Sequence, residues 1–170
     1  MNAWLRRAGR GLLPDGRTLV WSVAEGRRGQ RWRSSTLGPE GRLDLVLLME
    51  VDGDGRFNRL ELTTSRGMLT LHPEPDRSRV DGNVVSDGGV TPISLPWSSE
   101  HVLWVRDSPI AEILTGRVEA ADGRTRRGLS INSELELVPA TRPMEEGSVP
   151  SADGRGVPEL DASVEWDLEP

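Results

Sequence analysis

Apolar and polar residues alternate along most of the chain, and the alternation is strongest between residues 43 and 71. Every second residue over 43–51 is Leu, Met or Val, so in an extended chain these side chains share one face. The same period returns over 60–62 and 69–71. Asp-Gly pairs at 52–55 and a glycine at 67 separate the three segments, and such residues are typical of hairpin turns. The pattern predicts three antiparallel strands.

Shorter segments with the same alternation precede and follow this stretch, separated by Gly, Pro or Asp. Short strands at regular intervals are typical of a sandwich or of an open or closed barrel. Only the segment from Asp107 to Leu114 also fits a short helix, because Asp or Ser before Pro is a common helix start. We therefore predict an all-β fold, a curved antiparallel sheet that is open or half closed as a barrel, with at most one short helix. The predicted flanking strands are 17–24, 30–36, 79–85, 90–95, 101–105, 117–120 and 129–138.

The length of 170 residues suits one well-buried domain. Residues 1–138 are predicted to form this antiparallel β domain. Residues 139–161 are rich in Pro, Gly, Ser, Asp and Glu and are predicted to form a loop or mobile tail. Alternation returns at Val164, Trp166 and Leu168, which indicates that 162–170 return to the same domain as an edge strand.

Charge and composition exclude several classes of protein. A net charge of −6 and a pI near 5.0 argue against nucleic-acid binding, which normally uses a basic surface. Without cysteine there is no disulfide, thiolate nucleophile or cysteine zinc site. No apolar run reaches the roughly 18 residues of a membrane span, and the N-terminus lacks the apolar run of a signal peptide. A cytoplasmic location is expected, and no cofactor is expected because no phosphate-binding GxxxxGK motif is present.

Residues 50–61 have the spacing of a calcium-binding EF-hand loop. Oxygen-bearing side chains stand at its first, third, fifth, ninth and twelfth positions, and Gly55 stands at the sixth, where a sharp bend is needed. An EF-hand also needs helices on both sides, whereas the alternation around this loop favours strands. A β-hairpin with solvated acids is the favoured interpretation, and a metal site is the alternative. The candidate metal ligands are Glu50, Asp52, Asp54, Asn58 and Glu61.

Catalytic motifs are absent from the sequence. There is no G-x-S-x-G nucleophile elbow. His72 and His101 do not stand in a cluster with acids that resembles a zinc or general-base arrangement. The sequence therefore favours a non-enzymatic function and predicts no catalytic residue, and a hydrolase that uses His72 or His101 as its base is the enzymatic alternative.

Three stretches carry a family resemblance. They are VDGDGRFNRLELT, in which an acidic turn precedes an aromatic residue and a basic strand; MLTLHPEPDRSRVDGNVV, with an L-x-L strand and a DG hairpin; and GVTPISLPWSSEHVLWVRDSPI, a sheet segment that runs into a Pro-Ile element. Together they span 51–110 and resemble the bacterial glycolipid-binding family. The fold of that family is a curved antiparallel sheet similar to that of lipoprotein carriers.

The resemblance implies non-enzymatic binding of a small amphipathic or apolar ligand, such as a glycolipid or lipid, in the concave face of the sheet. Tryptophan suits the wall of such a site as well as a core, because the indole is large and apolar and carries one N–H donor. Two arginines are expected to contact a polar or anionic head group. The predicted ligand-binding residues are Trp21, Phe57, Arg59, Trp97, Trp104 and Arg106.

Two further functions stay open at the level of the sequence. A protein-interaction module could use the acidic tail or exposed strand edges, because an edge strand offers unpaired backbone groups to a partner. Homodimerisation through such an edge is equally open.

Overall fold

The computed structural model describes residues 5–106, 108, 125–143 and 161–165. In these residues the chain forms strands and turns and no helix, so the prediction of an all-β fold is confirmed. The segment for which a short helix is predicted lies outside the described residues, apart from Ser108. Within the described part, no helix has the length and hydrophobicity needed to cross a membrane.

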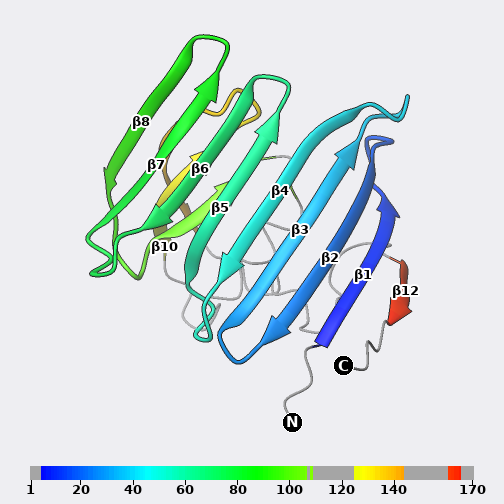
Figure 1. Cartoon of the computed structure of the whole chain (residues 1–170), viewed down its shortest axis with the longest axis horizontal. Helices are drawn as coiled ribbons and strands as arrows, with labels where there is room; N and C mark the ends of the chain where they lie inside the picture. Colours follow the sequence, from blue (N-terminus) through cyan, green and yellow to red (C-terminus); the bar gives the residue numbers. More distant parts are fainter. Residues whose placement is uncertain (1–4, 107, 109–124, 144–160, 166–170) are drawn as a thin grey trace.

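A large open sheet forms most of the molecule (Figure 1). Eight consecutive strands pair antiparallel with their neighbours in the order of the sequence, and β12 (Asp161–Glu165) pairs antiparallel with β1. The sheet does not close, because β8 and β12 stand at opposite edges. The eight strands are β1 (Leu5–Leu12), β2 (Thr18–Gly26), β3 (Gly29–Leu37), β4 (Leu43–Val51), β5 (Phe57–Thr64), β6 (Gly67–Pro73), β7 (Arg79–Ser86) and β8 (Gly89–Pro96). The edge strand β8 contains Pro92 and Pro96.

A second, smaller sheet lies behind β5 to β7 in Figure 1. Its strands are β9 (Val102–Val105), β10 (Thr125–Ile131) and β11 (Leu137–Pro143). Strand β10 pairs antiparallel with β11 but parallel with β9, which departs from the predicted all-antiparallel arrangement. Strand β11 also extends five residues into the stretch 139–161 for which a loop is predicted. The predicted strand at 117–120 lies outside the described residues.

Polar contacts join the two sheets at the β5–β6 turn. The Thr64 hydroxyl donates a hydrogen bond to the backbone oxygen of Ser133, at 3.0 Å. Arg66 forms an ion pair with Glu134 at 2.8 Å. Both partners belong to the turn between β10 and β11, so this hairpin is held against the β5–β6 end of the large sheet.

The hydrophobic core lies between the two sheets, on one face of the large sheet, which we call the inner face. The alternation seen in the sequence places apolar side chains of β2 to β7 on this face. The small sheet packs its own apolar side chains against them, and together they form one buried cluster. Its buried members include Leu19, Trp21, Trp32, Leu45, Leu47, Met49, Leu60, Leu62, Leu69, Leu71 and Val80 from the large sheet, and Leu103, Val105, Leu129 and Ile131 from the small one.

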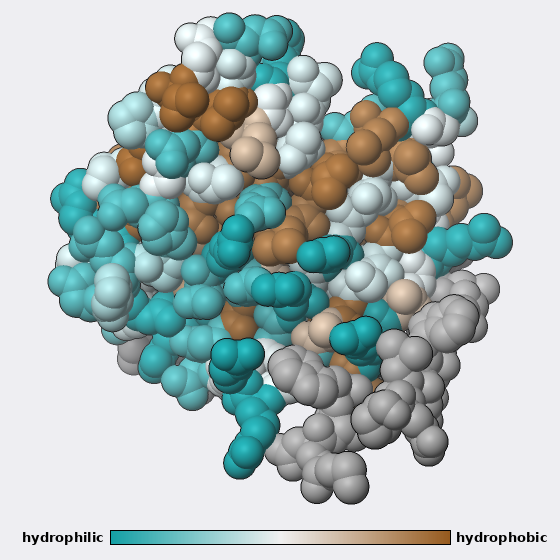
Figure 2. Space-filling view, in the orientation of Figure 1, coloured by the Kyte–Doolittle hydropathy of each residue, from teal (hydrophilic) through white to brown (hydrophobic). Residues whose placement is uncertain are grey.

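The opposite, outer face of the large sheet carries both charged and apolar side chains. Figure 2 shows brown hydrophobic patches among teal hydrophilic residues on this side of the molecule. The strand register aligns one row of mainly apolar positions from β2 to β8. This row consists of Val20, Ser35, Val46, Thr63, Met68, Val85 and Val90, the last two being neighbours across the β7–β8 hairpin.

Candidate functional site

The four aromatic residues of the predicted ligand site are all buried and fall into separate groups. Trp97 follows β8 and contacts Phe57 edge-on, with ring centroids 5.7 Å apart. Its other neighbour is the His101 ring, at 5.3 Å. Trp21 on β2 instead pairs with Trp32 on β3, at 5.9 Å and with a tilt of 33°. Trp104 lies in β9, in the small sheet.

The two arginines of the predicted site do not join these aromatic groups. Arg59 is half exposed, stands opposite Glu50 on the outer face, and pairs with Glu61 two residues along its own strand. Arg106 follows β9, and its Nε donates a hydrogen bond to the Ser130 hydroxyl of the small sheet at 3.3 Å. Arg59 therefore points to the opposite side of the sheet from the buried aromatic side chains.

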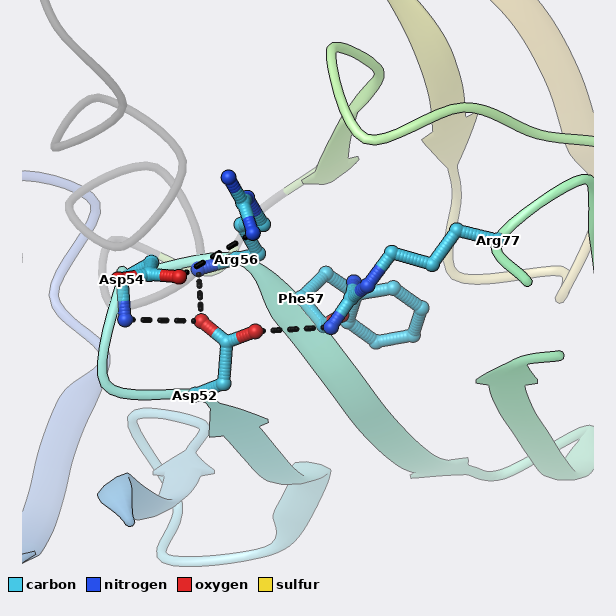
Figure 3. A network of polar contacts seen from close by, with 5 residues as sticks. All are labelled: Asp52, Asp54, Arg56, Phe57 and Arg77. Atoms are coloured by element: carbon cyan, nitrogen blue, oxygen red, sulfur yellow. Dashed lines mark hydrogen bonds and ion pairs between the residues drawn. The ribbon is translucent and has the colours of Figure 1, made fainter. Parts of the chain in front are cut away.

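The acidic loop forms the turn of the β4–β5 hairpin, and Asp52 organises it (Figure 3). Its Oδ1 accepts hydrogen bonds from the backbone N–H groups of Asp54 and Arg56, at 3.0 and 2.9 Å. Its Oδ2 accepts a hydrogen bond from Arg77, at 2.8 Å. Arg77 also donates to the backbone oxygen of Phe57 at 2.9 Å, so one guanidinium ties this turn to the loop between β6 and β7.

The other candidate metal ligands in this loop face arginines or solvent. Asp54 pairs with Arg56 at 3.1 Å, Glu50 pairs with Arg31 at 2.6 Å, and Glu61 pairs with Arg59. Asn58 is exposed. Strands flank the loop on both sides, so the segment forms a β-hairpin and lacks the helix–loop–helix frame of an EF-hand. Within the described residues, no three His, Asp or Glu side chains are grouped to hold a metal ion.

Neither histidine stands in a hydrolytic arrangement among the described residues. His72 is exposed and lies opposite Asp81 on the outer face. Asp81 accepts a hydrogen bond from the Ser94 hydroxyl at 2.5 Å, which lowers the pKa of Asp81. The Ser94 hydroxyl thus donates its hydrogen bond to the Asp81 carboxylate and not to the His72 imidazole, as it would in a Ser-His pair. His101 packs on Trp97.

A group of buried polar atoms lies on β2 and β3, and of its three residues only Trp21 was among the predicted site residues. The Ser34 and Thr36 side chains are 3% and 0% exposed, and neither hydroxyl has a hydrogen-bond partner among the described residues. The indole N–H of Trp21, which is 6% exposed, also lacks a partner. Trp21 stands directly opposite Ser34 in the strand register, and Thr36 follows Ser34 on the same face. We call Trp21, Ser34 and Thr36 the polar trio.

The surroundings of the polar trio are apolar. On β4, Leu47 stands opposite Ser34 and Leu45 stands opposite Thr36. On the other side, the indole of Trp21 lies over Gly9 of β1, where an added Cβ atom would come within 2.9 Å of the ring. The neighbouring Trp32 differs, because its indole N–H donates to Gln30 at 3.1 Å. The trio therefore places hydrogen-bonding capacity inside an apolar wall.

Sequence reasoning missed Ser34 and Thr36 because residues 30–36, QRWRSST, contain only one apolar side chain. A signal was nevertheless present. Ser34 and Thr36 stand two and four residues after Trp32, and side chains two apart on a strand share a face. Once Trp32 is assigned to the inner face, both hydroxyls must lie there too.

A surface cleft of about 360 Å³ lies between the β2–β3 and β4–β5 turns. Its charged lining residues are Glu25, Arg27, Asp52 and Asp54. Asp52 and Asp54 already pair with Arg77 and Arg56. Acidic and basic side chains both line this cleft, and its two aspartates are already paired, so the lining does not favour a ligand of either charge. We therefore take the polar trio as the stronger candidate site.

Comparisons with known proteins leave the family of this chain open. No family model matches the chain, and no curated protein matches it. Among solved structures, the crystal structure of a DUF1089 family protein from Pseudomonas aeruginosa is similar, with 16% sequence identity and a TM-score of 0.43. The similarity covers 96% of this chain and 92% of that chain. A likeness this loose supports no statement about fold or function.

Proposed function

We propose that the inner face of β2 and β3 binds an amphipathic ligand, a lipid or glycolipid, without converting it chemically. The polar trio is the observation that carries this proposal. An amphipathic molecule needs hydrogen-bond partners for its head group and apolar contact for its tail. The trio supplies the first, and the adjoining Trp and Leu side chains of β2 to β4 supply the second.

The energetic argument concerns what the trio costs a protein that binds nothing. A buried donor or acceptor without a partner destabilises the folded state by about 1–3 kcal/mol. Typical domains have a net stability of only about 5–15 kcal/mol, so three such groups consume a large share of it. A ligand head group that pairs with them recovers this loss, and apolar residues at the same positions would avoid it without any ligand.

The family resemblance implies the same kind of ligand but rests on other residues. It spans 51–110, whereas the trio lies on β2 and β3. Of the six predicted ligand-binding residues, Trp21 belongs to the proposed site. Arg59 points to the outer face and takes no part in the proposal.

The test begins with the purified full-length protein. We expect native mass spectrometry to detect a bound small molecule that organic solvent extracts, or to detect binding of a lipid added in a micellar or cyclodextrin carrier. The variant Ser34→Ala/Thr36→Val should lose most of this binding, because it removes two of the three polar partners and preserves the apolar wall. A matched control is Ser35→Ala/Thr63→Val, which makes the same changes on the outer face of β3 and β5. If the wild-type protein neither retains nor binds any lipid, the proposed function is wrong.

A further inference from the structure

The chemistry of the polar trio also defines the head group that it can accept. We propose that the site selects an uncharged head group with several oxygen atoms, such as a glycerol ester or a sugar, over an anionic one. This inference rests on the proposed function. It follows from three features of the site: the type of its polar atoms, the charge around them and their spacing.

The three polar groups suit neutral oxygen atoms. An indole N–H only donates a hydrogen bond, whereas a Ser or Thr hydroxyl both donates and accepts. Together they match a mixture of carbonyl and hydroxyl oxygens, because such a head group also offers both acceptors and donors. A carboxylate only accepts, so it would leave the acceptor capacity of Ser34 and Thr36 unused.

The charge on this part of the inner face favours the same class of ligand. Over the inner-face positions of β1 to β4, all of which are described, the charged side chains are Arg7 and Glu25. These two form an ion pair at 3.6 Å, so they add no net charge. An anion buried beside the trio would need a cation to offset its desolvation, whereas a neutral head group needs hydrogen bonds alone.

Arg59 and Arg106 do not alter this balance. They are the residues that the sequence analysis expects to contact a polar or anionic head group. Arg59 lies on the outer face and pairs with Glu61, and Arg106 bonds to Ser130 in the small sheet. Neither belongs to β1 to β4, which carry or flank the trio.

The spacing of the trio indicates a head group with more than one oxygen. The Trp21 indole lies over Gly9 on β1, while both hydroxyls are on β3. Neighbouring strands are about 4.7–4.9 Å apart, so β1 and β3 are separated by roughly 10 Å. Ser34 and Thr36 are a further two residues, about 7 Å, apart along the strand. A glycerol ester or a sugar can reach several of these groups at once, and a single hydroxyl can meet only one or two.

The experiment compares three probes that share one tail. These are 1-monooleoylglycerol, oleyl alcohol and oleate, each presented to the full chain from cyclodextrin at pH 8, where oleate is ionised. Binding is followed by tryptophan fluorescence and by calorimetry. We expect monooleoylglycerol to bind roughly tenfold tighter than either other probe, because it alone offers several neutral oxygens to the trio. Ser34→Ala/Thr36→Val should weaken monooleoylglycerol roughly tenfold, leave oleate unchanged and thereby remove the preference.

The controls separate this inference from the proposed function. Ser35→Ala/Thr63→Val on the outer face should retain the wild-type preference, and Ser34→Ala alone should give an intermediate loss. If oleate binds as tightly as monooleoylglycerol and ignores the substitutions, the inference about the head group is wrong while lipid binding stands. If none of the three probes binds to the wild-type protein and no lipid is extracted from it, both fail. The comparison of probes on the wild-type protein holds even if a variant does not fold.

Discussion

The two halves of the inner face, β5 to β7 and β2 to β3, bury different kinds of side chain. Over β5 to β7 the inner positions are Leu60, Leu62, Leu69, Leu71 and Val80, each at most 1% exposed, and the small sheet lies behind these strands (Figure 1). Over β2 and β3 the same face carries the polar trio and the Trp21–Trp32 pair. The first half has the composition of a dry core, whereas the second retains hydrogen-bonding atoms that no described residue satisfies. Departures from the rules of packing are expected at functional positions, so we expect stability to depend mainly on the first half and the proposed ligand binding to depend on the second.

The largest expected effect tests the apolar half. Leu62→Ala removes a side chain that is 0% exposed and leaves a cavity against its neighbours. We expect the free energy of unfolding to fall by about 2–5 kcal/mol, measured by urea denaturation. Lipid binding by the protein that remains folded should be unchanged. Loss of binding without loss of stability would contradict the division between the halves.

The next effect tests the indole over β1. Gly9→Ala places a methyl group within 2.9 Å of the Trp21 ring, so the ring must move within a packed region. We expect a loss of about 1–3 kcal/mol in the free energy of unfolding together with a changed near-ultraviolet circular dichroism spectrum. Gly53→Ala is the control, because the nearest atom to its added Cβ is the Arg27 backbone oxygen at an ordinary 3.7 Å. Equal effects at the two glycines would show that the indole is not held over Gly9.

A smaller effect is expected for the guanidinium that joins two turns. Arg77→Ala removes the hydrogen bonds to Asp52 and to the Phe57 backbone oxygen. Because the Arg77 side chain is partly exposed, at 23%, solvent screening should limit the loss to about 1 kcal/mol. Arg56→Ala on the β4–β5 turn removes only an exposed contact with Asp54 and should have almost no effect. Both variants should retain lipid binding, because neither touches the half with the trio.

In the half with the polar trio, substitution by apolar residues should not lower the free energy of unfolding. In the absence of lipid, Ser34→Ala/Thr36→Val is expected to leave the free energy of unfolding unchanged or to raise it by up to about 1 kcal/mol, because it removes buried groups without partners. Urea denaturation of lipid-free protein provides the measurement. A clear destabilisation would mean that protein groups already satisfy the two hydroxyls, and the contrast between the halves would disappear.

The smallest expected effect concerns pH and should not distinguish the halves. Asp15 lies at the β1–β2 turn, where a hydrogen bond from the Arg17 side chain lowers the pKa of its carboxyl below the ordinary 3.8. Asp76 lies at the β6–β7 turn, where the Ser78 backbone N–H and hydroxyl lower its pKa. A lowered folded pKa gives stability that is present above the ordinary value and is lost as pH falls through the folded value. We therefore expect a slight fall in stability below about pH 4, which Asp15→Asn and Asp76→Asn should each reduce.

Glu74 should have the opposite effect on the pH dependence of stability from Asp15 and Asp76. A hydrogen bond with Asp81 raises the pKa of Glu74 above the ordinary 4.5, so its contribution is present at low pH and is lost as pH rises through the folded value. Urea denaturation from pH 3 to pH 6 measures the balance, and Glu74→Gln should make the fall at low pH steeper. A stability that does not change over this range in the wild-type protein and in all three variants would contradict these assignments.

Much of the large sheet was predictable because alternation is a local property. The three strands predicted between residues 43 and 71 correspond to β4, β5 and β6. Strand β1 was not predicted, since LRRAGRGL has no apolar alternation and its structure depends on pairing with β2. The parallel pairing of β9 and β10 was also missed, because it joins segments about 25 residues apart and no local pattern records such a partner.

The candidate site was predictable only in part. The burial of Trp21 follows from its phase with Leu19 and Val23. The position of Arg59 on the outer face also follows from the alternation, because Arg59 directly precedes the buried Leu60. The family resemblance nevertheless implied that Arg59 contacts a ligand in the concave face, which a side chain on the outer face cannot do. The lack of partners at Ser34 and Thr36 could not be inferred, since it depends on which groups the fold brings near them.

The two prolines of β8 affect how readily the free edge of the large sheet can pair with another strand. Pro92 and Pro96 have no backbone N–H. The free edge of β8 therefore lacks hydrogen-bond donors at two positions where an added strand would need them. An incoming strand from another copy would find too few donors to continue the hydrogen bonding. The free edge of β8 is therefore a poor template for the addition of another strand.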